Sequence, residues 1–199
     1  MFVLTVDQRH SRRTRDRVEV LLRDLARRAD LVRPFERTAG DEVQAVLDRP
    51  ESVVDLTLLL VRDRQWSVGV GIGAVDQPLP ESTRAGSGPA FVHARAAVTA
   101  AKPRTTCLAV VGPDDGPARR AQTALDLVAA LLQRRTERGA EAVALAREGL
   151  NQLEVAGRLG VSKQAVSQRL QAADWHLEVP GRELAVHLLS EAAGRVGGS

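Results

Sequence analysis

The chain has 199 residues, of which 44% are hydrophobic and 27% charged, so its composition is that of a folded protein and not of a disordered one. Its single cysteine, Cys107, excludes an internal disulfide and a multi-cysteine zinc site, and it predicts a reducing, cytoplasmic environment. The net charge is only +3, and the scarcity of aromatic residues excludes a stacking platform for single-stranded nucleic acid.

The first half of the chain alternates strand-like and helix-like patterns. Apolar residues at 2–6 predict a buried strand, and the charged residues that follow leave this segment too short for a signal peptide or a membrane span. No membrane partner is therefore expected. Further strands are predicted at 32–38, 43–47, 66–73 and 105–111, and helices at 14–29, 50–62 and 90–101.

Two features of these strands constrain the sheet. Strands 32–38 and 43–47 are joined as a hairpin, and Pro34 places the first of them at a sheet edge. In the strand at 66–73, glycines alternate with apolar residues, and this bare glycine face lets another group approach the backbone closely. The order βαββαβαβ predicts an antiparallel or mixed sheet with helices packed on it, in the α+β class.

Glycine and proline flank an acidic pair at 112–117, which predicts a domain boundary. The predicted division is an α+β domain at 1–112, a linker at 113–117, an all-α domain at 118–193 and a frayed tail at 194–199. The helix at 118–135 carries an apolar stripe with heptad-like spacing, formed by Ala121, Leu125, Val128 and Leu132. This stripe either is the seam of a homodimer or packs on its own domain.

A helix-turn-helix is predicted between about residues 152 and 173. Asn151 and Glu154 have the spacing of a capping box, which starts the first helix. Gly160 supplies the positive φ that ends this helix, and Ser162 caps the second one. The preceding helix completes a three-helix core, and a short final helix at 182–193 braces it. The predicted buried contacts of the motif are Val155, Leu159, Val161, Val166 and Leu170.

The second helix of this motif keeps a polar face rich in glutamine and serine. Exposed helices normally favour Glu and Lys, whereas glutamine can read adenine by a paired hydrogen bond in the major groove of double-stranded DNA. The predicted base-reading residues are Gln164, Ser167 and Gln168, and the predicted phosphate contacts are Gln152, Ser162, Lys163 and Arg169. The alternative is a helical hairpin that contacts protein. Because the charges of 137–182 cancel, a monomer would bind DNA weakly and a dimer would compensate.

Carboxylates fall at two predicted strand ends. Asp7 ends the first strand, and Asp41 and Glu42 lie in the hairpin that should be beside it. Two carboxylates converging there suit an Mg²⁺ ion that holds the phosphates of a nucleotide. The alternative is structural, with Asp7 capping the next helix and Asp41 forming part of the turn.

Three segments carry a resemblance to a known family. They are TAGDEVQAVL at 38–47, VGVGIG at 68–73 and GPAFVHARAA at 88–97. Together with the strand order they resemble the SatD family, over nearly the whole chain. The resemblance implies a ferredoxin-like domain, similar to the palm of nucleotidyl and diguanylate cyclases, followed by a helix-turn-helix.

Carried over by position, the resemblance implies metal-binding roles for Asp7 and for Asp41 or Glu42. The chain departs from the cyclase motifs at two places. Ala39 replaces one of the two glycines before the acids of diguanylate cyclases, and His93 stands where class III cyclases have an asparagine. These departures imply a degenerate palm that binds a nucleotide without turning it over.

Two functions are compatible with these patterns. The first is a sequence-specific DNA-binding transcription regulator whose N-terminal domain senses a small ligand such as a nucleotide. It needs no cofactor beyond Mg²⁺ with that nucleotide. The second is an enzyme, a metal-dependent nucleotidyl cyclase or nucleotide hydrolase, whose C-terminal helices only localise it.

Overall fold

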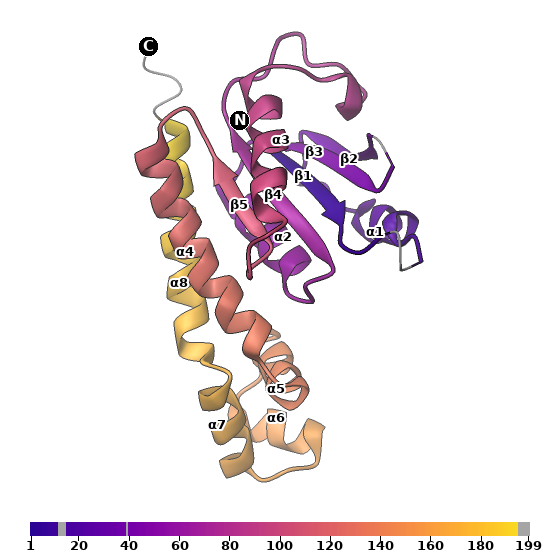
Figure 1. Cartoon of the computed structure of the whole chain (residues 1–199). Helices are drawn as coiled ribbons and strands as arrows, with labels where there is room; N and C mark the ends of the chain where they lie inside the picture. Colours follow the sequence, from indigo (N-terminus) through magenta and orange to yellow (C-terminus); the bar gives the residue numbers. More distant parts are fainter. Residues whose placement is uncertain (12–14, 39, 195–199) are drawn as a thin grey trace.

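The computed structural model describes residues 1–11, 15–38 and 40–194 (Figure 1). A mixed sheet has the strand order β2-β3-β1-β4-β5. Its strands are β1 (Phe2–Gln8), β2 (Arg33–Arg37), β3 (Glu42–Leu47), β4 (Trp66–Ile72) and β5 (Leu108–Val111). β1 is antiparallel to both of its neighbours, β2 is antiparallel to β3, and β5 runs parallel to β4. The α+β class is confirmed, and β2 with Pro34 lies at a sheet edge as predicted.

The helices follow the predicted order. They are α1 (Val18–Leu25), α2 (Pro50–Val61), the short 3₁₀ helix η1 (Thr83–Ala85), α3 (Pro89–Ala101), α4 (Asp115–Arg134), α5 (Glu137–Arg147), α6 (Gln152–Leu159), α7 (Lys163–Ala172) and α8 (Trp175–Gly194). α1 ends at Leu25, four residues earlier than expected. The predicted start of that helix at residue 14 and the sequence departure at Ala39 lie outside the described residues. No described helix is both long enough and apolar enough to span a membrane.

The glycine face of β4 is covered by α3. A Cβ atom on Gly71 would lie 2.2 Å from the backbone of both Ala90 and Ala94, and one on Gly69 would lie 2.2 Å from the Val98 nitrogen. Only glycine permits a helix backbone to come this near to a strand. The close approach predicted from the sequence is therefore made by this chain's own helix.

The opposite face of the sheet carries the main core, and this core continues past residues 112–117. Leu4 and Val70 pack in it with residues of α1 and α2. The four residues of the predicted stripe on α4 are buried in the same cluster, with Ala185 and Leu189 of α8. The stripe thus packs on its own chain, which is the second of the two predicted alternatives. Residues 112–114 connect β5 to α4, and the Asp114 side chain caps that helix, so residues 115–117 of the predicted linker form its first turn.

A second, smaller core lies between α5, α6 and α7. Figure 1 shows these three helices gathered at the end of the paired helices α4 and α8 that points away from the sheet. Their buried residues form a cluster separate from the main core, consisting of Ala142, Val143, Val155, Ala156, Val166, Leu170 and Ala173. The three-helix unit is therefore held to the sheet through α4 and α8.

Candidate functional site

Local capping contacts fix the turn between α6 and α7. The Asn151 side chain accepts a hydrogen bond from the Glu154 amide at 3.1 Å, and Glu154 accepts one from the Asn151 amide at 2.8 Å. Gly160 ends α6 with a φ of 63°, and the Ser162 hydroxyl accepts a hydrogen bond from the Ala165 amide at 3.2 Å. These predicted signals are confirmed. The chain therefore leaves one helix and enters the next within three residues.

The side of α7 that faces away from this small core is open. Gln164, Ser167 and Gln168 are exposed, and they share one side of the helix because they are three and four residues apart. α7 packs against α5, α6 and α8. Of the predicted phosphate contacts, Gln152, Ser162 and Lys163 are exposed and Arg169 is half-buried. The residues predicted to read bases therefore form an uncovered polar surface at the far end of the molecule.

An ion cluster around one buried carboxylate joins the three-helix unit to the rest of the protein. Glu178 of α8 is 0% exposed, and three arginines donate to its carboxylate. Arg135 Nη1 and Arg182 Nε both lie 2.9 Å from its oxygens, and Arg147 is the third donor. Arg182 also donates to Asp55 of α2 at 2.8 Å. The cluster thus links α2, α5, α8 and the end of α4.

Positive charge exceeds negative charge inside this cluster. Burial, followed by the neighbouring Arg182 guanidinium, lowers the pKa of both Arg135 and Arg147. The carboxylate of Glu178 is the group that makes this concentration of arginine tolerable. Sequence reasoning missed the cluster, because only the Glu178–Arg182 pair has a recognisable local spacing.

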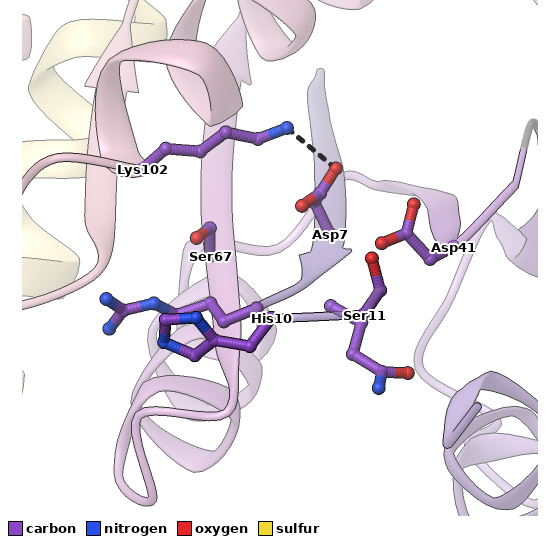
Figure 2. Close-up of a pocket in the computed structure, with 8 residues that line it drawn as sticks. Asp7, His10, Ser11, Asp41, Ser67 and Lys102 are labelled. Carbon is purple, nitrogen blue, oxygen red and sulfur yellow. Dashed lines mark hydrogen bonds and ion pairs between the residues drawn. The ribbon is translucent and has the colours of Figure 1, made fainter. Parts of the chain in front are cut away.

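A second candidate site is a cavity of about 570 Å³ at the end of β1 (Figure 2). Asp7 and Asp41 both line it, so the structure brings these two predicted residues together. Glu42 does not line the cavity. Its Oε1 accepts a hydrogen bond from the Thr38 hydroxyl at 2.7 Å and lies 3.0 Å from the Arg95 guanidinium.

One of the two carboxylates that line this cavity is paired with a lysine. Lys102, just after α3, places its Nζ 2.8 Å from Asp7 Oδ2, as Figure 2 shows. Among the residues that the structure describes, no group of three or more His, Cys, Asp or Glu side chains could hold a metal ion. His93 lies apart from the cavity lining and places Nδ1 2.6 Å from the Ile72 carbonyl oxygen. Of the three residues predicted to bind a metal, Asp7 and Asp41 line the cavity, Glu42 lies outside it, and Asp7 is paired with Lys102.

We expect about 5 mM Mg²⁺ to leave the melting temperature of the protein unchanged, because a ligand that does not bind the native state cannot stabilise it. Thermal denaturation followed by circular dichroism measures this. Lys102→Ala is the matched variant, since it removes the ammonium that neutralises Asp7. A rise in the melting temperature of the unchanged protein with Mg²⁺ would contradict the assignment of Lys102 as the counter-ion.

Comparison with known proteins adds no relative. The chain matches no protein-family model, no curated protein and no solved structure. A function for this chain is therefore inferred from the geometry of the two candidate sites.

Proposed function

We propose that this protein binds double-stranded DNA through α6 and α7 and regulates transcription. The observation that carries the proposal is the exposed glutamine and serine surface of α7. In a helix-turn-helix the second helix enters the major groove and presents the residues near its N-terminus to base edges. Gln164 and Gln168 have the side chains that pair with adenine there, and Ser167 lies between them.

Groups beside this surface suit the DNA backbone. Lys163 is exposed at the first position of α7, next to the residues proposed to read bases. A cation there lies where a recognition helix passes the phosphates, and phosphate contacts fix the orientation of the protein on the duplex. The half-buried Arg169 lies about one and two-thirds turns further along.

The sheet domain is proposed to sense a ligand. The antiparallel order β2-β3-β1-β4 is that of a ferredoxin-like fold, which supports the palm-like assignment and the resemblance to the SatD family. The cavity beside Asp7 and Asp41 is the place for a small ligand such as a nucleotide.

The experiment is capture of DNA by the purified full chain from a random duplex pool, followed by sequencing. We expect the captured fragments to share a motif, and their affinity to fall steeply as salt rises, because bound phosphates release counterions. Fragments indistinguishable from the input pool at low salt would contradict the proposal. They would favour the alternative in which α6 and α7 contact a protein.

A further inference from the structure

The outer side of the α4–α8 pair carries exposed leucines. Leu127 of α4 is 67% exposed, and Leu177 and Leu184 of α8 are each 50% exposed. Leu131 and Leu188, one turn from Leu127 and Leu184, are half-buried. We call these five residues the leucine face. Single exposed leucines are ordinary on protein surfaces, whereas a contiguous group marks an interaction site.

An ion pair fixes how the two helices are aligned. Arg120 Nη2 of α4 lies 2.6 Å from Glu191 Oε1 of α8. Leu127 is seven residues from Arg120, and Leu184 is seven residues from Glu191, so each leucine lies two turns along the same side of its helix. Because the helices run antiparallel, Leu127 and Leu184 lie at the same level across the seam. The leucine face is therefore continuous over both helices.

The two edges of this face carry opposite charge. Arg119 and Arg134 are exposed on the α4 side, and Glu183 is exposed on the α8 side. Arg120 and Glu191 already pair with each other across the seam. A surface that is apolar in the middle, basic along one edge and acidic along the other is complementary to itself.

We propose that the leucine face binds the same face of a second copy about a twofold axis parallel to α4 and α8. In this arrangement α4 of each copy lies against α8 of the other, and residues at equal levels meet. The basic α4 side of each copy then faces the acidic α8 side of the other. An axis perpendicular to the helices would instead set α4 against α4 and arginine against arginine, which costs energy.

This pairing has a consequence for the three-helix unit. The unit lies at one end of the α4–α8 pair (Figure 1), and a rotation about an axis parallel to these helices keeps both units at the same end. When the two copies of α7 are joined in this way, binding of the first to a duplex raises the effective concentration of the second at the same duplex. The pairing does not rest on DNA binding, and it is tested without DNA.

The first test is the oligomeric state, measured by analytical ultracentrifugation at micromolar concentration. We expect a dimer for the unchanged chain and a monomer for Leu127→Glu combined with Leu184→Glu. Val92→Glu on α3 is the matched control, because Val92 is also exposed, at 68%, and lies elsewhere. Circular dichroism confirms that each variant is folded. A monomeric unchanged chain, or a double variant that remains dimeric, overturns the proposal.

The second test is the direction of the pairing. Thr123 of α4 and His187 of α8 lie at one level, on opposite outer edges of the leucine face. The parallel arrangement brings Thr123 against the partner's His187. Under a mild oxidant we therefore expect a disulfide-linked dimer when Thr123→Cys protein is mixed with His187→Cys protein, and none from either alone. Cross-linking of Thr123→Cys alone, or no cross-link from the mixture, overturns the parallel axis.

Discussion

Replacing Gln164 and Gln168 together by alanine is expected to abolish recognition of the captured DNA motif. Each paired hydrogen bond between a side chain and a base contributes about 1–3 kcal/mol of discrimination. The two together are expected to contribute about 2–6 kcal/mol, which corresponds to at least about a thirtyfold loss of affinity. Both side chains are exposed, so the fold should be unaffected. Binding to a scrambled duplex should change little, because Lys163 remains.

Fluorescence anisotropy with a labelled duplex, in parallel with its scrambled version, measures this effect. Gln171→Ala is the matched control, since Gln171 is exposed on the same helix but lies near its C-terminal end. We expect this variant to bind within about threefold of the unchanged protein, because residues near the start of a recognition helix reach the bases. Equal affinity of the double variant and the unchanged protein would refute the base-reading assignment.

Replacing Glu178 by alanine is expected to destabilise the protein by about 3–5 kcal/mol, the usual result of removing one partner from a buried ion pair. The change would leave three arginine side chains crowded together without the carboxylate that accepts from all of them. Burial already lowers the pKa of these arginines, so their charged forms gain little from the protein interior. Urea denaturation followed by circular dichroism gives the free energy of unfolding.

Glu141→Ala provides the comparison for this experiment. Glu141 lies on α5 and is exposed, and such a surface substitution changes stability by about 0.5 kcal/mol or less. If Glu178→Ala and Glu141→Ala unfold at the same urea concentration, the ion cluster does not hold the three-helix unit in place.

The elements that sequence reasoning predicted well are those fixed by near neighbours. The capping box at Asn151, the left-handed Gly160 and the cap at Ser162 each depend on contacts within a few residues. The strand at 66–73 was marked by its alternation, and its glycine face predicted a close approach. Such patterns depend on residues that are close in sequence, so they could be predicted without knowledge of the tertiary structure.

The remaining features depend on partners that are distant in sequence. The stripe on α4 fits a dimer seam and an internal contact equally well, and only the position of α8 decides between them. Lys102 reaches Asp7 across 95 residues, which no local pattern reveals. The final helix begins at Trp175, before its predicted start at residue 182, and it contains Pro180. Proline usually ends a helix, but packing around Glu178 and Gly181 holds this one together.

Because α4 and α8 share a core with one face of the sheet, a movement at that core is transmitted along both helices to their far end. α4 has 20 residues and is therefore about 30 Å long. A tilt of about 5° where this helix meets the sheet would displace its far end by about 3 Å, which is comparable to the length of a hydrogen bond. Small rearrangements of α2 or β5 would thus produce larger displacements at α7. The sheet would in this way control the orientation of the exposed surface of α7, with which it makes no contact.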